Sequence, residues 1–234
     1  VSVLTLMLFQ AEIGMKAQRK FYQLICNFFG FTGLERSRFY LRARYLTPLL
    51  RLIRPYFNQL DFDELVIIDS FPVLLLFQPV RNHRIKVLNK VVNIGYCTFK
   101  NMWSYGLKVH LAVTVSGYIL DYLVTLAYSG SRRIAGDRVP YSRVLGDLGY
   151  LSKELKERLE AKGIHLWTPL CKNMEGIDER NIPAILAIRG TIETRIFVLN
   201  AMFDIEHPIV RSLAEWQLEI EQVLLAYHLE FFIN

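Results

Sequence analysis

Three carboxylates stand in sequence settings that could serve chemistry. Asp69 ends an apolar run, Asp147 lies in a Gly-Asp-Leu-Gly turn, and Glu193 follows Arg189 by one helical turn. A run as apolar as the one before Asp69 is typical of a strand buried on both faces, where an unpaired carboxylate is unfavourable. Asp69 therefore needs a partner or a metal. If all three carboxylates meet at one point, their mutual repulsion favours a bound divalent cation.

A ligand set made only of carboxylate oxygens favours Mg²⁺, with Mn²⁺ as the alternative. Two such ions, about 3.5 to 4 Å apart, stabilise the attacking and leaving oxygens of an in-line displacement at phosphorus. We therefore expect Asp69, Asp147 and Glu193 to be metal ligands and catalytic residues for phosphodiester chemistry. From the residues alone an ordinary interpretation stays open: a strand-end turn at Asp69, an Asp-x-Gly turn at Asp147, and a surface pair between Glu193 and Arg189.

Positive charge is concentrated in the N-terminal quarter of the chain. Residues 1–60 hold nine Lys and Arg against two acidic residues, a net charge of +7, whereas the rest of the chain has a net charge of −1. Such asymmetry is typical of a segment that meets a polyanion such as nucleic acid, although a solvated helix face gives the same pattern. The residues that we expect to contact DNA phosphates here are Arg36, Arg38, Arg42 and Arg44.

A second basic stretch directly follows Asp69. Residues 70–120 contain no acidic residue at all. Because this stretch is next to Asp69 in the sequence, it is a second candidate for phosphate contact. In this stretch we expect contacts with DNA phosphates from Arg81, Arg84, Lys86 and Lys108.

Alternating hydrophobicity predicts the strands that would position the carboxylates. We expect strands at residues 65–69, 105–115 and 118–128, the last two as a hairpin, and a short strand through Val144 that ends at Asp147. Along residues 105–115 one face would be core and the other polar, with His110 on the polar face as a hydrogen-bonded structural residue. A further strand is expected at residues 164–170.

Helical spacing predicts two or three short helices in residues 16–60, and a helix capped by Ser152 and closed by Gly163. After a loop at residues 172–181, Pro183 suits the first turn of a helix that runs to about Phe203 and carries Glu193 at the edge of its packed side. A final amphipathic helix follows Pro208. This order predicts an α/β fold, with a central mixed sheet flanked by helices. Its domains would be a basic helical DNA-binding region at 1–60, incomplete at its start, and a catalytic domain at 61–234.

The composition excludes several classes of protein. The hydrophobic fraction of 52% suggests a membrane protein, but the most apolar window, residues 65–80, is interrupted by polar residues and shorter than the roughly 20 residues of a spanning helix. The apolar start lacks the basic flank and cleavage site of a secretory signal. Three scattered cysteines indicate neither a disulfide framework nor a zinc site. We expect a soluble, cytoplasmic protein.

Four sequence blocks together resemble a known family. They are Ile67-Ile68-Asp69-Ser70-Phe71-Pro72, Tyr105-Gly106-Leu107-Lys108-Val109-His110-Leu111, Gly146-Asp147-Leu148-Gly149-Tyr150-Leu151-Ser152 and Arg189-Gly190-Thr191-Ile192-Glu193-Thr194. In this order they resemble the blocks of DDE-type bacterial insertion-sequence transposases, over roughly residue 37 to the C-terminus. The resemblance implies an RNase H-like catalytic domain in which Asp69, Asp147 and Glu193 bind two Mg²⁺ ions.

The resemblance also implies a reaction and its partners. Water would attack the phosphodiester at the element end, and the freed 3′-hydroxyl would then attack target DNA without a covalent protein intermediate. Arg189 would face the DNA or orient the carboxylate. The partners would be double-stranded DNA, as terminal inverted repeats and as target, and a second copy of the chain in a synaptic complex, in the bacterial cytoplasm.

Some positions depart from the family pattern. Leu186 and Asn200 stand where related transposases often carry Tyr and Lys, and Leu148 stands where Lys is common. These departures motivate an alternative function, a catalytically inactive DNA-binding remnant of a transposase. A cellular RNase H-like nuclease without joining activity is disfavoured by the C-terminal blocks.

Overall fold

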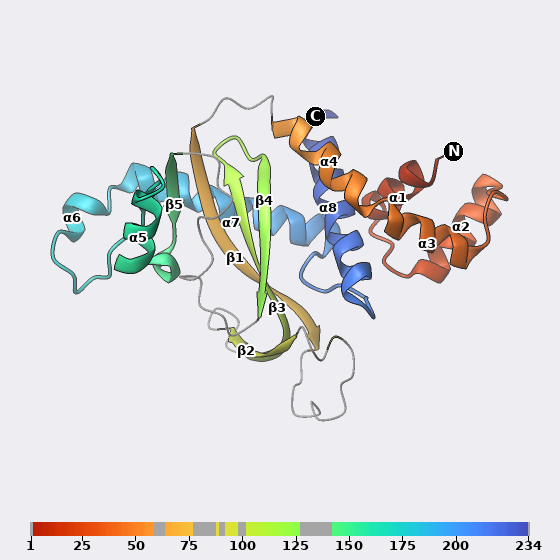
Figure 1. Cartoon of the computed structure of the whole chain (residues 1–234), viewed down its shortest axis with the longest axis horizontal. Coiled ribbons are helices and arrows are strands. Elements are labelled where there is room, and N and C mark those ends of the chain that lie inside the picture. The colour runs from red at the N-terminus through yellow and green to blue at the C-terminus, as the bar shows by residue number, and fades with distance from the viewer. Residues whose placement is uncertain are drawn as a thin grey trace. The chain divides into compact units, whose positions relative to one another are not determined.

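The chain is described by a computed structural model that covers residues 2–58, 64–76, 88, 92–97, 102–126 and 142–233. Within this part the chain divides into two units, one helical and one built on a sheet (Figure 1). Arg81, Arg84 and Lys86, which the sequence places at the DNA, lie outside the described residues. None of the helices in the described part combines the length and the apolar character that crossing a bilayer requires.

The helical unit contains α1 (Val3–Glu12), α2 (Gln18–Phe29), α3 (Arg36–Tyr45), α4 (Thr47–Asn58), α8 (Leu213–Ile233) and the end of α7 (Pro183–Phe203). The three helices α2 to α4 confirm the prediction for residues 16–60. Helix α1 was not predicted, because its residues are apolar on most sides and show no helical periodicity. Ser2 caps α1 by accepting a hydrogen bond from the backbone of Thr5, and Met7 is fully buried.

In the described part of the chain, the second unit is built on a six-stranded mixed sheet. Its strands are β1 (Leu65–Leu76), β2 (Asn93–Cys97), β3 (Met102–Thr114), β4 (Ile119–Leu126), β5 (Arg143–Gly146) and β6 (His165–Trp167). The order is β2-β3-β1-β5-β6, and β4 also pairs with β3. Strand β1 is antiparallel to β3 and parallel to β5. The mixed sheet flanked by helices confirms the predicted fold class and is consistent with an RNase H-like fold.

Strand β1 extends well beyond the predicted end at Asp69. It runs to Leu76 and continues through Pro72, which pairs with Lys108 of β3. The parallel pairing with β5 stops at Ile68, so among the described residues the missing N–H of Pro72 falls where β1 pairs with β3 alone. Asp69 therefore lies within β1, at the point where β5 ends.

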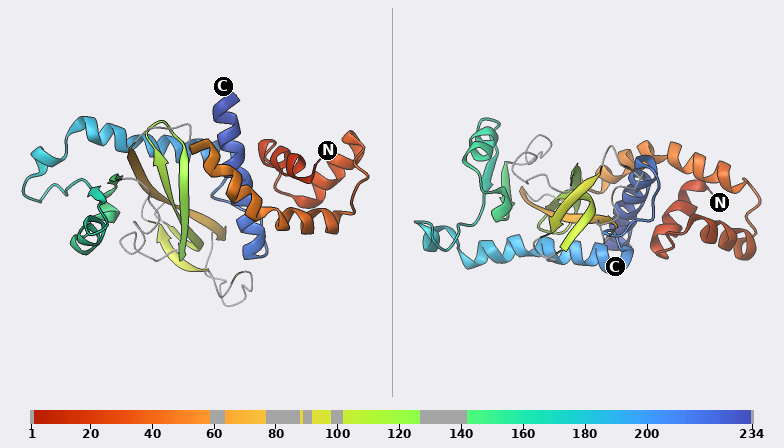
Figure 2. Two further views of the ribbon diagram at one scale, coloured as in Figure 1. Left: turned by 45° about the horizontal axis from the view of Figure 1, so that its top comes forward. Right: turned by 90° about the horizontal axis from the view of Figure 1, so that it is seen from below.

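Both faces of the central strands are buried, which corrects the expectation of one core and one polar face on β3. His110, Ala112 and Thr114, all on the predicted polar face, are buried. On that face β1 and β3 pack with α5 (Lys153–Glu160), whose Leu155 and Leu159 belong to the same apolar cluster. Helix α7 lies along the opposite face (Figure 2).

Other element boundaries differ slightly from the expectations. Strand β6 has three residues instead of the predicted 164–170, and a single-turn helix α6 (Ile177–Arg180) forms inside the predicted loop. A short 3₁₀ helix, η3 (Leu148–Tyr150), follows β5. The predicted helix from Pro183 to Phe203 is confirmed as α7, and α8 begins at Leu213.

Candidate active site

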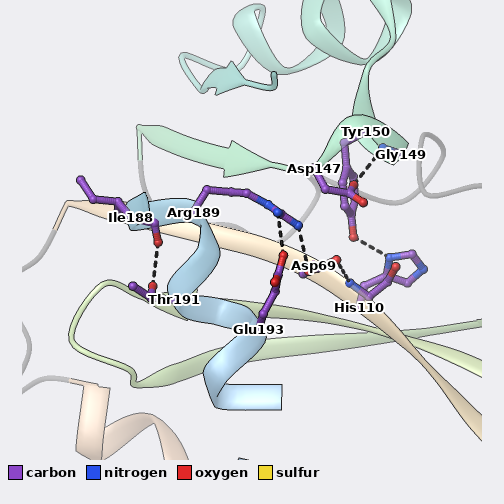
Figure 3. Close-up of polar contacts among 10 residues, drawn as sticks. Asp69, His110, Asp147, Gly149, Tyr150, Ile188, Arg189, Thr191 and Glu193 are labelled. Carbon is purple, nitrogen blue, oxygen red and sulfur yellow. Dashed lines mark hydrogen bonds and ion pairs between the residues drawn. The ribbon is translucent and has the colours of Figure 1, made fainter. Parts of the chain in front are cut away.

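The parallel pairing of β1 with β5 brings Asp69 and Asp147 to the same level of the sheet. Ile67 pairs with Leu145, and Ile68 pairs with Gly146. Asp69 directly follows Ile68, and Asp147 directly follows Gly146. Successive side chains of a strand alternate between the faces, so neighbouring positions of paired strands share a face. Figure 3 shows both side chains beside the residues of α7.

Glu193 reaches the same region from α7. Ile192, the neighbouring residue, is fully buried, and Arg195 Nη2 donates to the backbone oxygen of Ser116 at 3.2 Å. These contacts fix the part of α7 that carries Glu193 against the sheet. The Glu193 side chain itself is 61% exposed, whereas that of Asp69 is 13% exposed.

The guanidinium of Arg189 joins the two carboxylates. Arg189 Nη2 lies 3.3 Å from Asp69 Oδ2, and Nη1 lies 2.7 Å from Glu193 Oε1 (Figure 3). The surface pair between Arg189 and Glu193 that the ordinary interpretation expected is therefore present. The same guanidinium also bridges to β1, which the helical spacing alone did not indicate.

Burial leaves the charge of Asp69 only partly compensated. The pKa of the Asp69 carboxyl is raised to about 6, chiefly by burial and then by the negative charges of Asp147 and Glu193. The backbone N–H of Ser70, which donates to Oδ1 at 2.7 Å, and the guanidinium of Arg189 both lower this pKa. The net rise means that burial and the neighbouring carboxylates outweigh the stabilisation that Arg189 and the Ser70 backbone give to the charged form of Asp69.

Asp147 begins the turn that follows β5. Its Oδ1 accepts a hydrogen bond from the backbone of Gly149 at 2.9 Å, so it also fulfils the expected Asp-x-Gly turn. A Cβ on Gly146 would lie 3.2 Å from the Cβ of Tyr150. Glycine at this position therefore lets the ring of Tyr150 fold closely under the turn.

Tyr150 and His110 form a buried polar contact beneath this turn. The Tyr150 hydroxyl lies 2.9 Å from His110 Nδ1, and His110 Nε2 lies 3.1 Å from Thr125 Oγ1. Burial, followed by the charge of Lys108, lowers the pKa of His110 to about 4, so the ring is neutral at pH 7. The expected structural role of His110 fits these contacts. The role of Tyr150 was missed, because its partner lies 40 residues earlier.

The donor chemistry of the site fits a divalent cation, but the side chains do not form a closed ligand set. Within the described part of the chain, no three side chains of Asp, Glu, His or Cys are grouped closely enough to hold a metal ion. The donors themselves are suitable: a buried, undercompensated carboxylate beside two others is the environment that hard cations favour. Arg189 lies where Asp69 and Glu193 approach each other.

The expected DNA-contacting residues lie on separate elements. Arg36, Arg38 and Arg42 are exposed on α3 of the helical unit. Arg44 on the same helix lies 4.0 Å from Glu215 of α8. Lys108 lies on β3 and is half-buried.

The chain was compared with known protein families. Residues 60–213 match the model of a family described as a transposase DDE domain. The matched segment contains all three carboxylates and Arg189. A comparison with curated proteins gave no match.

Proposed function

Because this chain belongs to the family of transposase DDE domains, we propose that it is a transposase that acts on the ends of its own insertion sequence. Hydrolysis would break the P–O3′ bond at the element end and leave a free 3′-hydroxyl. That hydroxyl would then attack a phosphodiester of target DNA, with the target 3′-oxygen as the leaving group. The observation that supports this most directly is the register that sets Asp69 beside Asp147.

We assign the carboxylates a shared role as ligands. Asp69, Asp147 and Glu193 would hold two Mg²⁺ ions, or Mn²⁺, which when bound would stabilise negative charge on the attacking and leaving oxygens. Asp69 would be the most rigid ligand, because it lies within β1 and is buried. Glu193 is the most exposed of the three, so it has the most freedom to adjust.

Basic residues would bind the DNA through its phosphates. The proposed contacts are Arg36, Arg38, Arg42 and Arg44 of α3 and, later in the sequence, Arg81, Arg84, Lys86, Lys108 and Arg189. The DNA partners would be the terminal inverted repeats and the target. Joining two element ends in one complex further suggests a homodimer, and the setting would be a bacterial cytoplasm.

An Asp147→Asn variant tests the catalytic assignment. Asparagine keeps an oxygen that can accept the hydrogen bond from Gly149, so the turn should persist while the charge is lost. With a labelled element end and Mg²⁺, we expect cleavage to fall by at least about 100-fold. Asp178→Asn, a matched change at an exposed residue of α6, should cut at the parent rate.

The outcomes separate the proposed functions. Cleavage by Asp147→Asn at the parent rate would exclude the assigned mechanism. If the parent protein shifts element-end DNA in a gel but does not cut it with Mg²⁺ or Mn²⁺, the inactive DNA-binding remnant is favoured. Strand cleavage without any joining to plasmid DNA would instead indicate a nuclease.

A further inference from the structure

Arg189 occupies the position between Asp69 and Glu193, the two carboxylates that come from β1 and α7. We propose that Arg189 is the internal cation of the metal-free site, and that its bridge between these carboxylates excludes a divalent cation. Metal binding then requires the guanidinium to leave. This inference rests on the proposed function, because it assumes that the three carboxylates are metal ligands.

The bridge uses the oxygen atoms that a metal ion would need. Arg189 contacts Asp69 Oδ2 with Nη2 and Glu193 Oε1 with Nη1. A Mg²⁺ ion binds carboxylate oxygens directly, so a cation held by Asp69 or Glu193 would need oxygens that the guanidinium of Arg189 now contacts. The two cations would compete for the same lone pairs and repel each other. The bridge thus occupies oxygens that a closed ligand set would need.

The guanidinium is itself incompletely satisfied in this position. Its side chain is 19% exposed. The Nε of Arg189 is buried, and no acceptor in the described part of the chain lies within hydrogen-bonding distance of it. A buried donor without an acceptor is destabilising, so the bridged position gains two carboxylate contacts but leaves the Nε donor unsatisfied. Once the guanidinium leaves the bridge, this N–H becomes available to another acceptor, such as a DNA phosphate oxygen.

The exchange couples the metal to the DNA. When a divalent cation binds the carboxylates, the N–H groups of Arg189 are released and can donate to a DNA phosphate. When a phosphate binds Arg189, the carboxylate oxygens are released and can bind the cation. Coupling between two binding events is reciprocal, so each ligand must strengthen the binding of the other by the same factor. Arg189 would therefore delay assembly of the metal site until DNA is present.

The first experiment measures Mn²⁺ binding to the whole chain without DNA, from the electron paramagnetic resonance signal of free Mn²⁺. Arg189→Gln removes the competing charge, so we expect Mn²⁺ to bind about tenfold more tightly than to the parent. Arg189→Lys keeps a charge but lacks the two-pronged geometry, so its affinity should lie between the two. Arg143→Gln, the same change at an exposed residue at the start of β5, should bind within about twofold of the parent.

The second experiment measures the reciprocal effect on DNA. Fluorescence anisotropy reports the affinity for a labelled element end with Ca²⁺, chosen as a divalent cation in place of Mg²⁺, or with EDTA. In the parent and in Arg143→Gln, Ca²⁺ should strengthen DNA binding by several-fold. In Arg189→Gln this gain should largely disappear, because the residue that links the two ligands is absent. Circular dichroism melting in EDTA checks that each variant is folded.

Different results overturn different steps. If Arg189→Gln and the parent bind Mn²⁺ equally, while Asp69→Asn loses the ion, the metal site exists and the exclusion by Arg189 is wrong. If Asp69→Asn binds Mn²⁺ as the parent does, the carboxylate site itself is wrong, and the proposed function fails together with this inference. A Ca²⁺ gain that persists in Arg189→Gln would exclude the coupling to DNA.

Discussion

At the scale of single residues, Asp69 is where burial and charge conflict most directly. It is a strand residue at 9% exposure, and its neighbours include one arginine and two further carboxylates. An isolated charge in this position would be neutralised or expelled. Its retention in the middle of a buried strand is understandable if a cation takes over the compensation that Arg189 provides only in part.

This conflict predicts a pH-dependent instability of the metal-free protein. The pKa of Asp69 is about 6 in the folded protein against an ordinary value of 3.8, so between these pH values the folded state holds the proton more tightly than the unfolded state. Stability should therefore fall as the pH rises from 4 to 7, by about 2 kcal/mol from this group alone. Urea denaturation in EDTA across this range measures the fall.

Asp69→Asn provides the comparison for this prediction. The variant should be about as stable as the parent at pH 4 and more stable than the parent at pH 7, because it has no charge to desolvate. Asp178→Asn, at an exposed position, should follow the parent at every pH. A stability difference between Asp69→Asn and the parent that does not change with pH would contradict the predicted conflict.

The sequence predicted three carboxylates as a candidate site, but it did not predict all of their contacts. The pair between Arg189 and Glu193 follows from helical spacing, because residues four apart share a face of a helix. The contact between Arg189 and Asp69 joins residues 120 positions apart. It depends on how α7 packs against β1, and no local pattern in the sequence specifies that packing.

At the scale of elements, the turn after β5 is held by contacts from the opposite face of the sheet. Asp147 belongs to the face that carries Arg189, whereas Tyr150 packs into the apolar cluster with α5. Strand β1 lies between β5 and β3, so the side chain of Tyr150 must cross β1 to reach His110. The contact between the Tyr150 hydroxyl and His110 therefore links the turn that carries Asp147 to β3.

Tyr150→Phe tests this anchor. Loss of the hydroxyl leaves a buried nitrogen of His110 without its partner, so we expect a loss of about 1 to 3 kcal/mol in unfolding free energy. Because the turn also carries Asp147, the Mg²⁺ concentration for half-maximal cleavage should rise by about tenfold or more. Urea denaturation and a Mg²⁺ titration of the cleavage rate measure the two effects.

Tyr22→Phe is the control for the anchor, because the Tyr22 hydroxyl donates to the backbone oxygen of Leu34 at 2.5 Å within the helical unit. It should lower stability to a similar extent and leave the Mg²⁺ requirement unchanged. Equal Mg²⁺ requirements in both variants would mean that Tyr150 contributes to stability alone.

Two glycines give opposite predictions for the same substitution. A Cβ on Gly106 of β3 would lie 1.9 Å from the backbone oxygen of Val73, so Gly106→Ala should force β1 and β3 apart and destabilise the protein by at least about 3 kcal/mol. A Cβ on Gly190 of α7 would meet nothing within 4 Å. Gly190→Ala should stabilise the helix by about 0.5 to 1 kcal/mol. Thermal and urea unfolding measure the stability of both variants. If Gly190→Ala lowers the unfolding free energy, the claim that a Cβ at Gly190 meets no other atom is wrong.

Element types were more predictable than element limits, for a physical reason. The alternation along β3 and the stripe along α7 are visible in the sequence because each repeats over several turns or residue pairs. The length of β1 was not predictable, because Pro72 usually ends a strand, and it is tolerated here only where β5 has already stopped. Whether a second strand pairs with β1 at Pro72 depends on the arrangement of the whole sheet, which the local sequence does not specify.

At the scale of the whole molecule, the basic helix α3 and the carboxylates belong to different units. The exposed arginines of α3 belong to the helical unit, and the carboxylates belong to the sheet unit. The family match covers residues 60–213, so it includes the carboxylates and leaves α3 outside. The assignment of DNA binding to α3 therefore depends on charge alone, and a measurement specific to charge is needed to test it.

The salt dependence of DNA binding supplies that measurement. Each phosphate contact contributes about −0.9 to the slope of log affinity against log salt concentration. Changing Arg36, Arg38, Arg42 and Arg44 together to Gln should therefore reduce the steepness of this slope by about 3 to 4. The reduction should be nearer 3, because Arg44 is partly engaged with Glu215. Anisotropy titrations from low to high salt give the slope.

A matched loss of charge elsewhere makes this prediction specific to α3. Lys153, Lys156, Lys162 and Lys172 are four exposed lysines of the sheet unit, and Gln at these positions removes the same net charge. If only the total charge of the protein matters, both sets of variants will flatten the slope equally. If α3 is the binding element, only the arginine set will do so, and at low salt with saturating DNA that variant should still cut at the parent rate, because its carboxylates and Arg189 are unchanged.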